Sequence, residues 1–205
     1  MPDSPDTAGR TRAAKAALRS RLLTVRQSLT SEERSTAAVA VQAATTRLVR
    51  RSAASTTAAY VPVGTEPGGA HLPEVLAGAL TGTGRLLLPV LLADGDLDWA
   101  EYRGPDSLAP SARGLREPRG RRVGVDAVRD AELIVVPALA VDRTGVRMGR
   151  GGGSYDRVLP RATGLIVALL HDGELVEAVP AEPHDRPVHA VITPSRGLTM
   201  VGTGS

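Results

Sequence analysis

The sequence predicts an α/β fold, a single three-layer domain in which helices flank a mostly parallel central sheet, with two helices at the N-terminus. Short apolar, β-branched runs alternate along the chain with helical segments, as in strands that are buried on both faces of a parallel sheet. The length of 205 residues suits one such domain. A hydrophobic fraction of 42% with 23% charge is ordinary for a globular protein.

Residues 1–9 are expected to form a disordered leader, and residues 10–205 a single domain. The first helix is predicted from Thr11 to Ser28. Its apolar residues recur at steps of three and four and form one stripe: Leu18, Leu22, Val25 and Leu29.

Lys15 and Arg19 lie four residues apart at the edge of that stripe. Long side chains at such an edge can cover apolar surface and project their charge into an adjoining cleft. A Lys/Arg pair at this spacing is also common on a solvated helix face, so the spacing alone leaves both roles open.

Thr30 and Glu33 form the pattern of a capping box, which predicts a second helix that runs to about Arg51. A short helix is expected over Leu72–Leu80, and the Pro-, Gly- and Arg-rich stretch Gly104–Arg122 is expected to be a loop. Apolar and β-branched runs predict six strands: Thr56–Val61, Arg85–Leu88, Leu97–Tyr102, Glu132–Val136, Thr163–Leu170 and Val188–Ile192. In such sheets ligands bind in the crevice beyond the carboxyl ends of the strands.

The composition excludes several classes of protein. The chain has no cysteine, which removes disulfide scaffolds, Cys-ligated zinc and thiol nucleophiles. Its apolar runs are too short to span a bilayer, and the first residues lack the apolar segment of a secretory signal. We therefore expect a cytoplasmic protein with no membrane partner.

The basic residues are unevenly distributed. Residues 1–51 carry a net charge of +6, and residues 52–205 a net charge of −3. Of the 25 basic residues, 24 are arginine and Lys15 is the one lysine. No blanket of positive charge covers the chain, so a nucleic-acid partner is not expected.

The stretch from Val135 to Arg157 contains most of the residues that could bind a ligand or a metal ion. A strand ends, a loop follows, and a glycine-dense turn enters a short helix near Tyr155. Glycines allow the backbone to approach a ligand, and successive backbone N–H groups can bind an anion. Arg147 and Arg150 flank the turn and could contact phosphate, and Asp156 could hold a metal ion that bridges phosphates.

Known phosphate-binding motifs fit this turn poorly. A Walker A loop needs a lysine after its last glycine, and the turn has none; the dinucleotide fingerprint needs a glycine where Ser154 stands. A flexible turn and an RNA-binding Arg-Gly segment remain alternatives, although the segment lacks interleaved aromatic residues.

Taken together, several strings resemble the 5-formyltetrahydrofolate cyclo-ligase family over nearly the whole chain. They are Lys15-Ala-Ala-Leu-Arg19, Leu29-Thr-Ser-Glu-Glu-Arg34, Tyr60-Val-Pro-Val-Gly-Thr-Glu66-Pro, Leu87-Leu-Pro-Val-Leu91, Leu115-Arg-Glu-Pro118, the glycine-dense turn, and Pro180-Ala-Glu-Pro-His-Asp185. The resemblance implies an enzyme that uses ATP and Mg²⁺ to close 5-formyltetrahydrofolate into 5,10-methenyltetrahydrofolate, through phosphorylation of the formyl oxygen.

The resemblance also implies roles for individual residues. Arg150 and Tyr155 would be catalytic, Glu66 and Arg19 would bind the folate, and Asp156 and Asp185 would hold Mg²⁺. The ATP-binding residues would be Lys15, Arg19, Arg147, Met148, Gly149, Arg150, Gly151, Gly152, Gly153, Ser154 and Tyr155.

The chain departs from the family pattern at Ser154, where a tyrosine is usual, and at His189, where an aspartate is usual. Two other readings remain: a related ATP-dependent enzyme acting on another formyl or acyl compound, and an anion- or RNA-binding module. His71, His171 and His189 are expected to be structural or exposed, and the protein to be a monomer or a weak homodimer.

Overall fold

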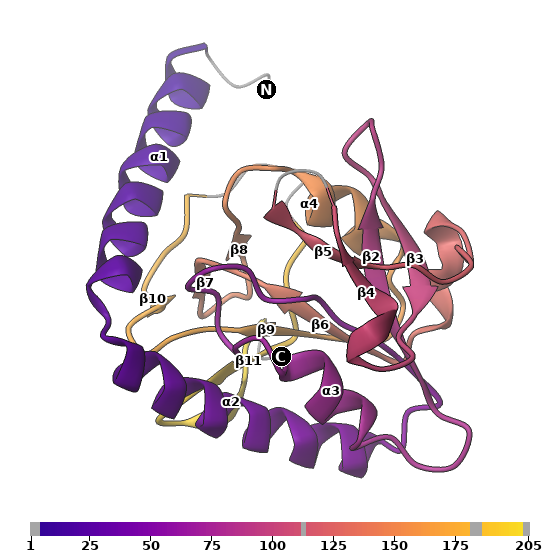
Figure 1. Cartoon of the computed structure of the whole chain (residues 1–205). Coiled ribbons are helices and arrows are strands. Elements are labelled where there is room, and N and C mark those ends of the chain that lie inside the picture. Colours follow the sequence, from indigo (N-terminus) through magenta and orange to yellow (C-terminus); the bar gives the residue numbers. More distant parts are fainter. Residues whose placement is uncertain (1–4, 112–113, 181–185, 203–205) are drawn as a thin grey trace.

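The computed structural model describes residues 5–111, 114–180 and 186–202. Its centre is a seven-stranded sheet with the order β12-β11-β9-β6-β1-β2-β3 (Figure 1). The five inner strands pair in parallel and the two edge strands run antiparallel, so the predicted mostly parallel sheet is confirmed. The strands are β1 (Thr56–Ala58), β2 (Arg85–Leu91), β3 (Leu97–Glu101), β6 (Leu133–Pro137), β9 (Leu165–Leu169), β11 (Ala190–Thr193) and β12 (Gly197–Met200).

Both faces of the sheet are covered, which makes the three layers. Side chains alternate between faces along β6, so that Leu133 and Val135 join one buried cluster and Ile134 and Val136 the other. The first cluster includes apolar residues of α2 (Ser31–Ser52) and α3 (Leu72–Ala77), and the second those of α4 (Ser154–Val158). Two 3₁₀ turns, Val125–Asp130 and Leu159–Arg161, lie with α4 on this second face. Burial on both faces explains why the inner strands are continuous apolar runs.

The capping box at the start of α2 is present as predicted. The Thr30 hydroxyl accepts from the Glu33 backbone N–H at 3.1 Å, and the Glu33 carboxylate accepts from the Thr30 N–H at 2.7 Å. Two backbone N–H groups at the start of the helix, which have no partner within it, are thereby satisfied. The helix ends at Ser52, followed by Ala53 in the left-handed conformation with φ 48°.

Helix α1 (Pro5–Ser28) begins earlier than the sequence indicates and includes residues 5–9 of the expected leader. Proline is well tolerated in the first helical turn, because that turn has no partner for its backbone N–H. Residues 1–4 lie outside the described part of the chain. In Figure 1, α1 rises along one side of the molecule, and its N-terminal half extends past the central sheet.

The buried line of α1 differs from the predicted stripe. Leu22 is buried, with Leu18 packed beside it, but Val25 is 49% exposed, and Arg26 lies buried one turn after Leu22. This line contacts a second sheet of three strands in the order β10-β7-β8. Its strands are β7 (Ala140–Asp142), β8 (Arg147–Met148) and β10 (Leu175–Val176).

The prediction of a loop over Gly104–Arg122 was wrong in part. A 3₁₀ turn (Pro105–Ser107) leads into a two-stranded hairpin of β4 (Leu108–Pro110) and β5 (Arg116–Pro118). These strands are too short to show an alternating pattern in the sequence, and they are held by tertiary contacts such as the bond from the Leu91 N–H to Glu117 Oε1 at 3.0 Å. Among the described helices, none is both long and apolar enough to cross a membrane.

The capping box makes a prediction about stability. Thr30→Ala removes the acceptor for the Glu33 N–H and should lower the free energy of unfolding by about 1 kcal/mol. Thr30→Ser keeps a hydroxyl acceptor and should retain most of the stabilisation that the cap provides. Chemical denaturation measures the difference. Ser35→Ala, at an exposed position in the same helix, is the matched control. Equal stability of Thr30→Ala and the wild type would show that the cap contributes nothing.

Candidate functional site

A cavity of about 650 Å³ opens at the carboxyl ends of the central strands. The strand order reverses beside β1, since β2 lies on one side of it and β6 on the other. Loops that leave β1 and β6 therefore diverge and leave a crevice between them. Strand β1 ends at Ala58, three residues short of the prediction, and Tyr60, Val61 and Glu66 of the following loop line the cavity together with Pro137 at the end of β6.

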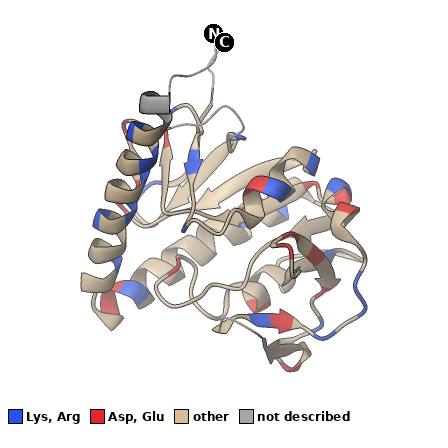
Figure 2. Ribbon diagram, turned by 90° about the horizontal axis from the view of Figure 1, so that it is seen from above, with Lys and Arg blue, Asp and Glu red and all other residues tan. Residues whose placement is uncertain are grey.

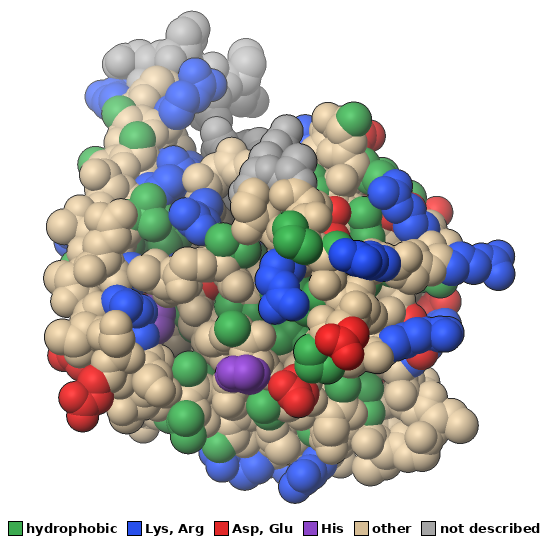
Figure 3. All heavy atoms as spheres, viewed as in Figure 1, with side chains coloured by type: hydrophobic (Ala, Val, Ile, Leu, Met, Phe, Trp, Pro, Cys, Tyr) green, Lys and Arg blue, Asp and Glu red, His purple; other side chains and the backbone are tan. Residues whose placement is uncertain are grey.

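Helix α1 provides a third wall and three of the basic residues that line the cavity. Arg12, Lys15 and Arg19 all line the cavity, as their spacing of three and four residues requires. Figure 2 looks onto the molecule from above and shows basic residues placed along α1. In Figure 3, basic side chains gather along α1 and across the middle of the body. Six of the described lining residues are basic and three are acidic, which favours an anionic ligand.

The structure brings together nearly all the residues singled out in the sequence. Lys15, Arg19, Glu66 and the whole run 147–156 line the one cavity, although they come from three distant parts of the chain. Asp185, the second expected metal ligand, lies outside the described residues. The lining thus matches the expected set, while the role of each residue remains a prediction.

The glycine-dense turn is joined to α1 by Arg19. The Arg19 Nε donates to the Gly149 carbonyl at 3.1 Å, and its guanidinium lies beside Gly151. Gly151 has φ +103°, which a side chain would strain, and a Cβ on it would meet the guanidinium at 3.6 Å. Helix α4 beyond the turn is only five residues long. The anion-binding capacity of this region therefore comes from the arginines and loop amides more than from a helix dipole.

Arg147 and Asp156 form an ion pair across the turn. Arg147 is buried, its Nη2 donates to Asp156 Oδ1, and its Nη1 donates to the Pro137 carbonyl at 3.3 Å. Its guanidinium carbon also lies 5.9 Å from the centre of the Tyr155 ring. Arg147 is thus committed to protein contacts, whereas the Asp156 side chain remains partly exposed to the cavity.

Arg150 and Glu66 meet across the cavity. Arg150 Nη1 lies 3.6 Å from Glu66 Oε1, with the Arg150 side chain 54% exposed and that of Glu66 only 11%. The other carboxylate oxygen, Oε2, accepts from the Val63 N–H at 2.9 Å. The residue expected to bind folate therefore contacts the residue expected to steady phosphate, so ligands of the two kinds would lie next to each other.

Burial raises the pKa of the Glu66 carboxyl, and the Val63 N–H and the Arg150 charge offset only part of the rise. A buried carboxylate that keeps one oxygen toward a cavity lowers the stability of the folded protein. Such an arrangement is typical of a binding residue, because ligand donors can replace the missing water.

The Tyr155 hydroxyl is buried without a hydrogen-bond partner among the described residues. Burial, with the nearby Glu66 charge, raises the pKa of Tyr155, so the phenol stays protonated. An orphaned O–H beside a cavity is a donor that a bound ligand can use. Ser154 precedes it at the start of α4 and lines the same cavity, so its small side chain leaves more room than a tyrosine would.

Magnesium is compatible with this site through Asp156. No group of three or more His, Asp or Glu residues gathers within the described ranges, so the protein offers no closed cage of ligands there. Mg²⁺ typically binds through one or two carboxylates, substrate phosphates and water. A partly exposed carboxylate at the edge of a basic cavity fits that pattern.

Four lining residues with polar side chains received no role from the sequence: Arg12, Tyr60, Arg116 and Glu117. Arg12 lies three residues, about one helical turn, before Lys15. This spacing could have indicated from the sequence that Arg12 lies on the same side of the helix. The sequence predicts a loop where the hairpin that carries Arg116 and Glu117 lies. No pattern in the sequence therefore indicated that these two side chains reach the cavity. Trp99 and Tyr102 are buried in the core.

The chain is similar over almost its whole length to one group of proteins. The model of the 5-formyltetrahydrofolate cyclo-ligase family matches residues 11–194. A 5-formyltetrahydrofolate cyclo-ligase of Mycolicibacterium smegmatis is 41% identical over 195 residues, which cover 92% of this chain and 97% of that protein. One from Escherichia coli is 34% identical over 117 residues, covering 55% of this chain and 64% of that protein. The NMR structure of Aquifex aeolicus 5,10-methenyltetrahydrofolate synthetase has a TM-score of 0.77 and 30% identity, covering 93% of this chain and 94% of that one.

The raised pKa of Glu66 predicts a pH-dependent effect on stability. The folded state holds this proton more tightly than the unfolded chain, so the ionised carboxyl costs stability once the pH rises through the folded pKa. Glu66→Gln should therefore raise the free energy of unfolding at about pH 8 and change it little at about pH 3.5.

Glu33→Gln is a control of opposite sign, since hydrogen bonds with Thr30 lower the pKa of Glu33. That variant should lose stability at about pH 8 and less of it as the pH falls toward about 3.5. A Glu66→Gln protein less stable than the wild type at the higher pH would contradict the assignment of Glu66 as a strained, buried carboxylate.

Proposed function

The chain belongs to the 5-formyltetrahydrofolate cyclo-ligase family, and from this premise we propose that it uses ATP and Mg²⁺ to convert 5-formyltetrahydrofolate into 5,10-methenyltetrahydrofolate, ADP and phosphate. One observation carries the proposal. The contact of 3.6 Å between Arg150 and Glu66 joins a basic, glycine-lined half of the cavity to a half that holds a buried carboxylate. A phosphoryl donor and a pterin bound in these halves would be adjacent.

The nucleotide half is built from α1 and the glycine-dense turn. Lys15 and Arg19 would contact ATP phosphates from one side, and the backbone of residues 147–155 from the other. Arg19 already holds the Gly149 carbonyl at 3.1 Å, so it also sets the position of the turn relative to α1.

The folate half centres on Glu66. A carboxylate accepts the paired N–H donors of a pterin ring in a fixed orientation. Because the carboxylate is buried, water does not reach it fully, and the ligand's N–H groups would supply the missing hydrogen bonds. These bonds favour the ionised form, so the raised pKa of Glu66 would fall when the ligand binds. Glu66 would thereby orient the formyl group toward the nucleotide half.

The chemistry proceeds in two displacements. The formyl oxygen attacks the γ-phosphorus of ATP, the bond from that phosphorus to the bridging oxygen breaks, and ADP leaves. N10 of the folate then attacks the activated formyl carbon, and after N10 loses its proton the carbon–oxygen bond breaks and phosphate leaves. Arg150 is exposed enough to exchange Glu66 for the transferred phosphoryl group and to neutralise its charge. The protonated Tyr155 hydroxyl would donate a further hydrogen bond there.

Asp156, with Asp185 as a second candidate beyond the described residues, would hold Mg²⁺ directly or through water. The ion supplies neutralisation of phosphate charge when bound. Arg147, paired with Asp156, fixes the direction of that carboxylate from behind.

The first test is the activity itself. Purified protein given ATP, Mg²⁺ and 5-formyltetrahydrofolate should produce the absorbance of the methenyl compound, and omission of any one of the three should abolish it. Loss of the signal with folded protein would favour a related enzyme acting on another formyl or acyl substrate. Binding to RNA that needs no Mg²⁺ and weakens steeply with salt would instead favour the anion-binding module.

The second test concerns the helix wall. Lys15→Ala should weaken ATP binding about tenfold, because it removes one charge-assisted phosphate contact, and should leave the fold intact. Arg21→Ala is the matched control: it removes one positive charge from an exposed position of the same helix and does not line the cavity. Isothermal titration calorimetry measures both. Equal ATP affinity in the two variants would exclude Lys15 from the nucleotide site.

A further inference from the structure

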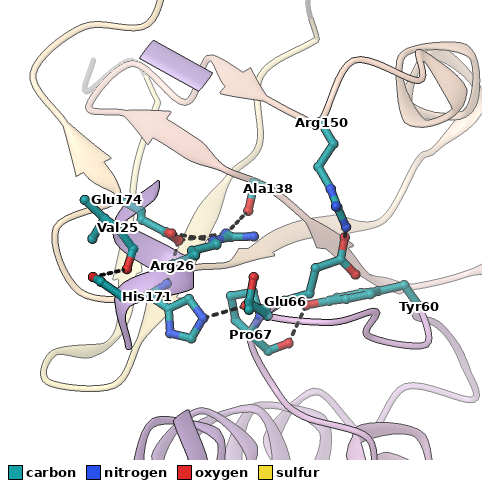
Figure 4. A network of polar contacts seen from close by, with 11 residues as sticks. Val25, Arg26, Tyr60, Glu66, Pro67, Ala138, Arg150, His171 and Glu174 are labelled. Carbon is teal, nitrogen blue, oxygen red and sulfur yellow. Dashed lines mark hydrogen bonds and ion pairs between the residues drawn. The ribbon is translucent and has the colours of Figure 1, made fainter. Parts of the chain in front are cut away.

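A buried polar network lies behind the loop that carries Glu66. It consists of Arg26 on α1, Glu174 in the turn after β9, and His171 at the start of that turn (Figure 4). We call these three residues the Arg26 network. None of the three lines the cavity, and the mechanism above uses none of them.

Arg26 and Glu174 form a two-point ion pair. Arg26 Nε donates to Glu174 Oε1 at 2.6 Å, and Arg26 Nη2 donates to Oε2 at 2.8 Å. Arg26 is 1% exposed and Glu174 is 3% exposed. Arg26 Nη2 also donates to the carbonyl of Ala138, a residue of the cavity wall after β6. The pair therefore links α1 and the turn after β9 to the edge of the site.

The Glu174 carboxylate in turn fixes His171. Its Oε2 accepts from the His171 backbone N–H at 2.7 Å, which closes the turn between the two residues. The imidazole Nε2 then lies 2.9 Å from the Thr65 carbonyl oxygen. Because a carbonyl oxygen only accepts, Nε2 carries the hydrogen and donates it. Figure 4 shows the imidazole between the Arg26–Glu174 pair and the loop that bears Glu66.

Side-chain donors from within the loop and from other elements hold the loop's carbonyl groups. Tyr60 Oη donates to the Pro67 carbonyl at 2.7 Å, and Gln42 Nε2 donates to the Gly68 carbonyl at 2.7 Å. The bond from His171 is the one that reaches the residue directly before Glu66. Within the loop, the Glu66 N–H donates to the Val63 carbonyl at 3.2 Å. A shift of the Thr65 carbonyl would therefore move the Glu66 backbone and its carboxylate.

Stability alone does not account for a buried ion pair of this kind. Desolvation of two charges offsets most of their attraction, and apolar residues of similar volume often serve as well. The Arg26 network instead provides what apolar packing lacks, a directed hydrogen bond at a chosen carbonyl.

We propose that His171, held in place by the Arg26–Glu174 pair, is a positioning residue that sets the Thr65 carbonyl and hence the placement of Glu66 for the folate. The proposal rests on the proposed function, because it concerns the affinity of the same site for its second substrate. It acts on the folate half alone, since His171 has no described contact with the glycine-dense turn.

A matched pair of variants tests it. The amide nitrogen of glutamine can reach the place of a histidine Nε2, whereas that of asparagine falls short. His171→Gln should keep the KM for 5-formyltetrahydrofolate within about twofold of the wild type. His171→Asn should raise this KM about tenfold, because a tenfold change corresponds to the loss of one buried hydrogen bond. The KM for ATP should stay unchanged in both. Equal folate KM in the two variants, or an equal rise for ATP, would overturn the proposal.

A second readout does not depend on catalysis. The backbone N–H groups of Val63 and Glu66 are protected by the bonds within the loop. Their hydrogen exchange, measured by NMR, should accelerate about tenfold in His171→Asn and not in His171→Gln. His189→Asn is the control, since that histidine bonds the Ile166 N–H through Nδ1 and does not line the cavity. Unchanged exchange at Val63 and Glu66 in His171→Asn would refute the positioning role, even in a protein that proved inactive on this folate.

The dependence on Glu66 completes the test. In a Glu66→Ala background, His171→Asn should weaken folate binding no further, because the residue through which His171 acts is gone. Additive losses would show that His171 acts on the folate by another route and would overturn the proposal. A wild-type protein without folate activity would reject the proposed function, while the exchange measurement would still decide whether His171 positions the loop.

Discussion

The reversal of strand order beside β1 is the constraint on which the rest of the structure depends. Strand β1 lies between β2, which follows it in the chain, and β6, which comes much later. Connections from neighbouring parallel strands leave in opposite directions at such a point, so the carboxyl ends of β1 and β6 cannot be covered by their own loops. The loop to Glu66 starts at one end and the wall at Pro137 and Ala138 at the other. The cavity is therefore a consequence of topology, and the chemistry of its lining is decided by what closes it.

Helix α1 closes the cavity, and the contacts that hold the helix in place are made by arginine side chains. Arg19 reaches the carbonyl of Gly149, and Arg26 reaches Glu174 and the carbonyl of Ala138. Each planar guanidinium makes contacts in directions that an ammonium group cannot match. The helix is thus attached to both walls of the cavity by the same face that presents Lys15 to it. In a chain with 24 arginines, the single lysine lies on the helix face that lines the cavity.

Charge pairing inside the cavity links its two halves. Glu66 contacts Arg150, and Asp156 contacts Arg147, so these two acidic groups, which are the described ones expected to meet a ligand, are each balanced by an arginine at the glycine-dense turn. The two pairs differ in burial. Arg147 is enclosed and acts as a fixed support, whereas Arg150 is half-exposed and can change partner at little cost. A substrate that takes Glu66 would leave Arg150 available to phosphate, which would couple occupancy of the folate half to the electrostatics of the nucleotide half.

The family resemblance supplied the roles expected of Lys15, Arg19 and Glu66. Local patterns in the sequence determined the helices, the capping box at Thr30, the apolar strands of a parallel sheet and the glycine-dense turn. Such features depend on periodicity and on short-range hydrogen bonds, which a single stretch of chain contains. The tertiary structure alone decided that Arg26 takes the buried place expected for Val25, that Glu174 and His171 support the loop at Thr65, and that Arg116 and Glu117 reach the cavity on a hairpin. Arg26 and Glu174 are 148 residues apart, and nothing in either neighbourhood specifies the other. A buried charge is tolerated only where a partner of opposite charge meets it, and that meeting is set by how the sheet and α1 pack.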